Sequence, residues 1–258
     1  MPALAQINVT PIKGTALQQV DYVSLSDVGI AGNRRFHLVD AQGRLLSGST
    51  FGPLVKVAAS HDPDAGVLTC QFPDGSIVES PTDALGAAHE TDFYGRPVPG
   101  HRVEGPLAGA FSAFVGQPVS LIRTERDGDG PDVFPLTVIS RASVADLGKR
   151  GGFEGELDPL RFRINLELDG CDPFEEDTWD GRLIRLGEAT LRIDGPIPRC
   201  VVTTQDPRTG ERDWNTLKQI ASFRPLMANR AGIPFGVYAT VEVPGKAALG
   251  DVVALLNI

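Results

Sequence analysis

Cys200 stands between two unlike halves of the stretch DGPIPRCVVTTQDPRTG, residues 194–210. The two prolines before it fix φ and make the approach to the cysteine stiff. The β-branched residues that follow, Val201–Thr204, are typical of a strand. A thiolate binds metals and attacks electrophiles, and an adjacent cation such as Arg199 can lower the pKa of the thiol. The stretch therefore favours a ligand or nucleophile, with a cysteine buried at the start of a strand as the alternative.

The other cysteines and the histidines give weaker signals. Cys70 alternates with Leu68 and Phe72, which predicts a core position, and Cys171 follows a glycine at an expected strand end. Three widely spaced cysteines indicate neither a disulfide framework nor a zinc ribbon. The four histidines are scattered, and the chain has no G-x-G-x-x-G, P-loop, G-x-S-x-G or H-E-x-x-H motif. A hydrolytic triad built on histidine is therefore unsupported.

Basic residues follow or precede glycine turns, or alternate along an expected strand: Lys13, Arg34, Arg35, Arg161 and Arg163. Residues two apart on a strand face the same side, and Asn165 would continue the face of Arg161 and Arg163. Such a row can hold a phosphate through charge-assisted, bidentate hydrogen bonds. For each arginine alone, a solvated strand face with nearby acidic partners is the alternative.

These residues must be positioned by many short strands. The chain contains 29 glycines and 20 prolines, and β-rich runs lie between them. Strands are expected at residues 7–12, 22–25, 35–39, 55–59, 67–72, 119–123, 134–140, 162–168, 183–186, 189–193, 201–204, 237–243 and 252–256. This spacing indicates a mainly β fold of barrels or sandwiches rather than a doubly wound sheet.

Helical signals are few. One short helix is expected over residues 143–147, with Ser140 or Ser143 as N-cap, and another over 213–220, with Asp213 as N-cap. A third is weakly indicated over residues 80–90. The polar, glycine-rich segment 124–133 is typical of an exposed linker. It suggests two domains, residues 1–123 and 124–258.

Length and charge limit the classes of function. The 258 residues fit one large domain or two compact ones, and 41% hydrophobic residues supply a normal core. The net charge of −9 gives no indication of nucleic acid or an anionic membrane as partner. No secretory signal and no apolar run long enough to span a membrane is found. We therefore expect a cytoplasmic protein with reduced thiols.

Taken in order, these stretches resemble the MOSC proteins, named for the C-terminal domain of molybdenum cofactor sulfurase, with their N-terminal β-barrel domain. The resemblance is carried by PIKG, by GIAGNRRFHLVD, by RFRIN, by GCDPFEEDTW and by RC followed by TTQDPRTG. It is nearest to the branch of the mitochondrial amidoxime reducing component and its bacterial relatives. It implies two β-barrel-like parts, residues 1–123 and 124–258, with a molybdenum cofactor (molybdopterin) between them.

The resemblance also implies roles for particular residues. Cys200 would be the catalytic residue and the protein ligand to molybdenum. The phosphate and pterin of the cofactor would be held by Lys13, Arg34, Arg35, Arg163, Asn165 and Arg199. The activity implied is an oxidoreductase that reduces N-hydroxylated or N-oxygenated small molecules with electrons from a separate donor protein. A sulfur-transfer protein with a persulfide on Cys200, or a non-catalytic cofactor carrier, remains an alternative.

The chain departs from the family pattern at four places. Gly14 replaces a serine, Asn33 an aspartate and Ile164 a proline, and Ser47–Thr50 lacks an arginine. These changes remove groups that could bind an anion, which suggests that the cofactor is retained weakly. Gly14→Ser should restore a hydroxyl, provided that Gly14 has no positive φ.

Overall fold

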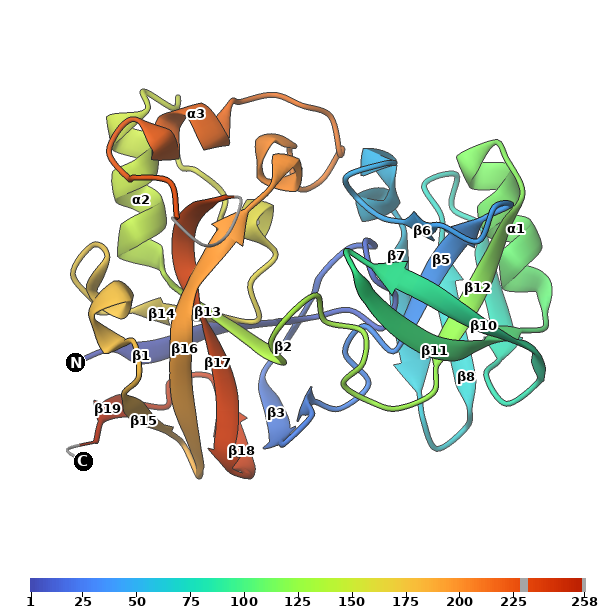
Figure 1. Ribbon diagram of the computed structural model, residues 1–258, viewed down its shortest axis with the longest axis horizontal. Coiled ribbons are helices and arrows are strands. Elements are labelled where there is room, and N and C mark those ends of the chain that lie inside the picture. Colours follow the sequence, from blue (N-terminus) through green and yellow to red (C-terminus); the bar gives the residue numbers. More distant parts are fainter. Residues whose placement is uncertain (228–231, 257–258) are drawn as a thin grey trace.

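The computed structural model describes residues 1–227 and 232–256, which form two lobes side by side (Figure 1). One lobe is built on an eight-stranded sheet with the order β19-β15-β16-β17-β13-β14-β1-β2. Its strands are β1 (Ala3–Val9), β2 (Gln18–Val20), β13 (Leu136–Ser140), β14 (Leu166–Asp169), β15 (Leu183–Leu186), β16 (Ala189–Arg199), β17 (Ile233–Val243) and β19 (Val253–Leu255). We call this part the eight-stranded lobe.

The second part, the five-stranded lobe, has a sheet with the order β10-β11-β12-β5-β6. The strands are β5 (Phe36–Asp40), β6 (Leu45–Leu46), β10 (Leu85–Phe93), β11 (Arg96–Val103) and β12 (Val119–Thr124). A smaller sheet is formed by β7 (Ala58–Asp62), β8 (Val67–Gln71) and β9 (Ile77–Pro81). Another joins β18 (Gly245–Ala248), β3 (Tyr22–Ser26) and β4 (Gly29–Ile30). The expected mainly β fold is confirmed, although none of these four sheets closes into a barrel over the described residues.

The N-terminal strand belongs to the lobe formed mainly by the second half of the chain. β1 pairs antiparallel with β14, and Ile7 lies opposite Leu166. The chain then crosses to the five-stranded lobe and returns through residues 125–135, which contain no helix or strand. The division at residue 123 therefore remains a prediction about folding units, and β1 lies across it. Among the described residues, no helix is long and apolar enough to cross a membrane.

Each lobe has its own apolar core. In the eight-stranded lobe, Ile7, Val138 and Leu166 are fully buried on neighbouring strands. In the five-stranded lobe, Phe36 and Phe111 are fully buried. Burying each such side chain contributes about 2 kcal/mol. A third apolar cluster also belongs to the eight-stranded lobe and includes the buried Ile139, Phe162 and Phe235.

Two of the helices agree with expectation in place. α2 (Arg141–Arg150) is capped by Ser140, whose Oγ accepts a hydrogen bond from the backbone N–H of Ala142. α3 (Thr216–Ala221) is shorter than predicted, and its N-cap is Asn215 rather than Asp213. α1 (Pro106–Val115) was not anticipated; it begins with a proline, a residue favoured in the first turn.

Several expected elements are wrong. Residues 80–90 contain the start of β10 instead of a helix, because they pair with β11. The expected strand at 201–204 is instead the 3₁₀ turn η4 (Val201–Thr204). The expected strands at 55–59 and 162–168 begin in 3₁₀ turns, η1 (Gly52–Lys56) and η2 (Pro159–Phe162), and only their ends belong to β7 and β14. A further 3₁₀ turn, η3, spans Glu175–Trp179. In η4 the hydroxyl of Thr203 donates to the carbonyl of Cys200, and this local bond favours a turn over an extended strand.

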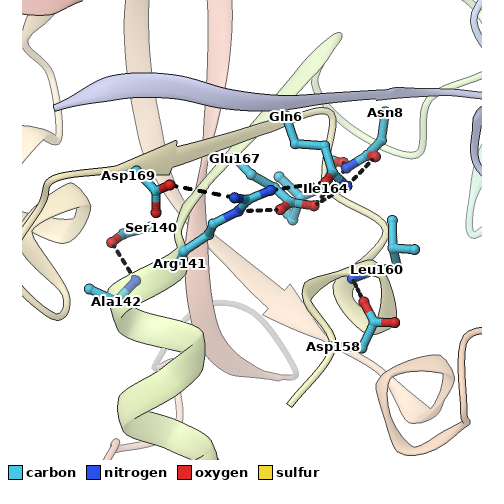
Figure 2. A network of polar contacts seen from close by, with 10 residues as sticks. All are labelled: Gln6, Asn8, Ser140, Arg141, Ala142, Asp158, Leu160, Ile164, Glu167 and Asp169. Carbon is cyan, nitrogen blue, oxygen red and sulfur yellow. Dashed lines mark hydrogen bonds and ion pairs between the residues drawn. The ribbon is translucent and has the colours of Figure 1, made fainter. Parts of the chain in front are cut away.

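A polar network joins β1, β14 and the start of α2, with Glu167 at its centre (Figure 2). Oε1 of Glu167 accepts from Asn8 (2.8 Å) and Gln6 (3.1 Å), and Oε2 accepts from Nε of Arg141 (3.1 Å). Asn8 also donates to the carbonyl of Ile164 at 3.0 Å. The network therefore fixes the backbone directly after Arg163, a residue of the site described below.

Glu167→Ala should lower the free energy of unfolding by about 2–3 kcal/mol, because Asn8 and Arg141 lose a buried acceptor. Asp169→Ala is the matched control: this carboxylate also pairs with Arg141 but its side chain is 59% exposed. We expect the control to cost no more than about 0.5 kcal/mol. Urea unfolding measures both, and equal losses would show that the network does not hold these elements together.

Candidate functional site

A pocket with a free volume of about 150 Å³ lies between the lobes. Lys13 and Arg34, which flank the core of the five-stranded lobe, contribute one side of it. Arg163, Arg199 and Cys200 of the eight-stranded lobe contribute the other. Five of the seven residues singled out from the sequence thus meet in one place.

Cys200 follows the last residue of β16 and is exposed to solvent. Its carbonyl accepts hydrogen bonds from the backbone N–H of Thr203 (3.2 Å) and from its hydroxyl (3.0 Å). These bonds make Cys200 the N-cap of η4 and correct the expectation of a following strand. The alternative of a buried strand cysteine is excluded, and the thiol is available to a ligand or metal.

The other two thiols are in different surroundings. Cys70 is fully buried in the core of the five-stranded lobe, as its alternation with apolar residues predicted. Cys171 is half-buried and packs against the core of the eight-stranded lobe. Burial raises the pKa of both thiols to about 12. Neither cysteine is therefore prepared for thiolate chemistry near neutral pH.

Arg199 lies against Cys200 with a buried guanidinium. Its Nε donates to the carbonyl of Phe235 (2.6 Å) and its Nη1 to that of Phe162 (3.0 Å). Nη2 is buried and has no hydrogen-bond partner among the described residues. Burial lowers the pKa of Arg199 to about 10, so the group is still charged at neutral pH. Arg199 therefore brings a positive charge to the wall of the pocket.

Arg34 and Arg163 approach each other from the two lobes. Both have left-handed backbones, with φ of 57° and 54°. Nη2 of Arg34 donates to the carbonyl of Arg163 (3.2 Å), and Nη2 of Arg163 donates to the carbonyl of Thr15 (2.6 Å). Burial, and then the positive charge of Arg34, lower the pKa of Arg163. These contacts hold two like charges together without neutralising them.

Lys13 is 6% exposed and is the fourth cation of the pocket. Its Nζ lies 2.6 Å from Oδ1 of Asp132 and donates to the carbonyl of Gly130 at 2.8 Å. The ammonium also lies 4.7 Å from the ring centroid of Phe93. Burial lowers the pKa of Lys13 to about 8, and Asp132 opposes part of this shift. Lys13 is therefore charged at neutral pH only with support from nearby anions.

Two residues assigned to the site lie elsewhere. Arg35 donates to the hydroxyl of Thr124 (3.2 Å) and to the carbonyl of Glu125 (3.3 Å), and it does not line the pocket. Asn165 is buried; it donates to the carbonyl of Asn8 (3.1 Å) and accepts from the hydroxyl of Thr137 (3.0 Å). The structure therefore gives both side chains roles in joining elements, with Asn165 tying β1 to β13.

The expected strand face of Arg161, Arg163 and Asn165 is also wrong. Residues 159–162 form η2, and the left-handed backbone of Arg163 breaks the alternation. Arg161 forms a bidentate pair with Asp213, with N···O distances of 2.7 and 2.8 Å. This pair explains why Asp213 does not cap α3. It also neutralises Arg161, although that residue lines the pocket.

Sequence reasoning missed several residues of the pocket, among them Tyr94 and Asp132. Tyr94 lies at the tip of the β10–β11 hairpin with φ of 56° and is 69% exposed. A residue followed by glycine between two β-rich runs is a hairpin signal that could have placed it. Asp132 belongs to the segment 124–133, which from residue 125 on forms no helix or strand, as expected for a loop. Polar contacts anchor this loop, because Asp132 pairs with Lys13 and Arg96 donates to two of its carbonyls.

The departures from the family pattern have structural counterparts. Gly14 has φ of +96°, and an added Cβ would lie 3.1 Å from Cδ1 of Leu54. The proviso on Gly14→Ser therefore fails, since serine would be strained there. Oδ1 of Asn33 accepts from the backbone N–H of Thr10 (3.1 Å), so this residue fixes a turn. Ser47 and Gly48 line the pocket in place of the missing arginine.

The chain is similar to known proteins over most of its length. Residues 125–254 match the model of the MOSC domain. Mitochondrial amidoxime-reducing component 1 of Homo sapiens is 27% identical over 283 residues, covering 98% of this chain and 83% of that protein. Component 2 of Bos taurus is 27% identical, covering 96% and 81%. Molybdenum cofactor sulfurase of Drosophila mojavensis is 27% identical over 92% of this chain but only 32% of that protein.

The surroundings of the three thiols predict their reactivity. In the folded protein, iodoacetamide should modify Cys200 about a hundredfold faster than Cys70 or Cys171, because only Cys200 is exposed. Peptide mass spectrometry over a time course measures the three rates. In urea the rates should become similar, which serves as the control. Modification of Cys171 as fast as Cys200 would contradict the assigned surroundings.

Proposed function

Because this chain belongs to the MOSC domain family, we propose that it binds the molybdenum cofactor in the pocket between its lobes and reduces N-hydroxylated or related N-oxygenated compounds. The chain covers most of the length of the amidoxime-reducing components that it resembles, which supports this class of activity. The electrons would come from a separate donor protein.

The observation that carries the proposal is the exposed thiol of Cys200 beside a pocket of cations. Thiolate is a soft ligand, suited to a transition metal. Arg34 and Arg163 offer charge-assisted donors for a phosphate monoester, and Arg199 adds positive charge. The two kinds of group lie on the same pocket, as a ligand that contains both a metal and a phosphate requires.

The residues of the chain would have separate tasks in this function. Cys200 would hold the metal, and the cations of both lobes would fix the phosphate and so orient the cofactor. When bound, the molybdenum cofactor would supply the two-electron chemistry. In the reduction the N–O bond of the substrate breaks, two electrons and two protons are taken up, and water leaves. Cys200 lies at the exposed rim, which gives a small substrate access.

A second candidate is sulfur transfer, favoured by the exposure of Cys200. An exposed thiol can carry a persulfide and pass its outer sulfur to an acceptor thiol. Purified protein would then release sulfide when treated with a reductant, with no metal required. Protein that carries labile sulfur and lacks molybdenum after expression in a host that makes the cofactor would favour this candidate over the oxidoreductase.

Replacing the proposed ligand tests the function directly. Protein from a host that makes the cofactor should contain about one molybdenum per chain. Cys200→Ala should lose most of this metal while its circular dichroism spectrum is unchanged, whereas Cys171→Ala should keep the metal. Metal analysis of the purified variants measures the effect. Loss of molybdenum in Cys171→Ala but not in Cys200→Ala would show that Cys200 is not the ligand.

Variants of Arg34 and of its neighbour Arg35 test where the phosphate is held. Arg34→Ala should weaken cofactor retention about tenfold or more, since a charge-assisted hydrogen bond is lost. Arg34→Lys should lie between this variant and the natural protein, because it keeps the charge without the planar fork. Arg35→Ala should have no effect, since Arg35 points to Thr124 and Glu125. Pterin fluorescence after dialysis measures how much cofactor each variant retains. If Arg35→Ala lost more cofactor than Arg34→Ala, the phosphate would not be held at Arg34.

A further inference from the structure

The pocket already holds an anion that belongs to the chain itself, the carboxylate of Asp132. Oδ1 of Asp132 lies 2.6 Å from Nζ of Lys13. Arg34 and Arg96 add to the positive field at this carboxylate. Asp132 therefore takes the position in which a negative group of a ligand would gain the most from Lys13 and Arg34.

The two side chains of this ion pair differ in how easily they can separate from each other and reach water. The side chain of Lys13 is 7% exposed, whereas that of Asp132 is 45% exposed. Asp132 lies in residues 125–135, which form no helix or strand. The segment is held from outside by Arg96, which donates to the carbonyls of Asp129 (2.8 Å) and Pro131 (2.5 Å). Asp132 can thus regain water by a local movement, while Lys13 cannot.

The pocket is smaller than most sites for small molecules. Its free volume is about 150 Å³, and small-molecule sites usually have about 300–1,000 Å³. Asp132, Val133 and Phe134 form part of its wall. A movement of the Asp132 side chain away from Lys13 would enlarge the pocket and free the ammonium from this carboxylate.

We infer that Asp132 is an internal competitor that determines how strongly the pocket binds a tetrahedral dianion: a phosphate monoester enters by displacing the carboxylate from Lys13. The inference deepens the proposed function, because it concerns the same pocket. A dianion offers two negative charges to Lys13, Arg34 and Arg163, whereas Asp132 offers one. The displaced carboxylate is hydrated by water. Asp132 keeps the buried ammonium paired until the exchange occurs.

The test uses sulfate, which remains a dianion over the useful pH range, and isothermal titration calorimetry of the full chain. Asp132→Asn should bind sulfate about tenfold more tightly than the natural protein, because a competing charge is removed. Asp132→Glu keeps the charge and should bind as the natural protein does. The titration is run near pH 6.5, because Lys13 has a pKa of about 8 and loses support when Asp132 is replaced.

Asp129→Asn is the matched control. It removes the same charge from the same segment, but Asp129 does not line the pocket, and its Oδ2 accepts from the backbone N–H of Arg126. Its sulfate affinity should be unchanged. Equal strengthening by Asp129→Asn and Asp132→Asn would mean a general charge effect and would overturn the inference. So would unchanged or weaker binding by Asp132→Asn. If neither the natural protein nor Asp132→Asn binds sulfate, the proposed function of the pocket fails as well.

Discussion

Repulsion between like charges is the constraint on which this structure depends. The pocket brings together four cations, Lys13, Arg34, Arg163 and Arg199, and burial lowers the pKa of three of them. The three arginines are held by backbone carbonyls, which fix the guanidinium groups without neutralising them. Arg161 shows the contrast, because its carboxylate partner cancels its charge. Charge kept in this way is available to a ligand, and a ligand that brings negative charge relieves the repulsion.

The arrangement of the lobes makes this concentration of charge possible. Lys13 and Arg34 come from one side and Arg163 and Arg199 from the other, so no single sheet must accommodate all four. In the buried network around Glu167, Asn8 also binds the carbonyl of Ile164 (Figure 2). This bond fixes the backbone directly after Arg163. The overall charge of −9 does not prevent an anion from binding, because charges beyond the screening length of about 8 Å at physiological salt contribute little.

The parts of the site that could be predicted are those carried by short contiguous stretches. Cys200 after its stiff approach and Lys13 before its glycine turn stand in such stretches, and both line the pocket. The resemblance implies both Arg34 and Arg35, yet of the two only Arg34 lines the pocket. Its left-handed backbone turns the side chain in a way that strand alternation does not anticipate. The role of Asp132 depends on a contact with a residue far away in the chain, and no local pattern marks it. The mainly β fold followed from the spacing of β-rich runs, while the 3₁₀ turn after Cys200 depends on threonine hydroxyls that bond the backbone.

The central claim is that Cys200 gives molybdenum its protein ligand in a pocket whose cations hold the rest of the cofactor. Molybdenum X-ray absorption of the loaded protein tests it most directly, by comparing the natural chain with Cys200→Ser under conditions in which both retain metal. The account predicts one sulfur neighbour fewer around molybdenum in the variant, replaced by a lighter atom. An unchanged number of sulfur neighbours would contradict it, because the thiolate of Cys200 would then not be bound to the metal.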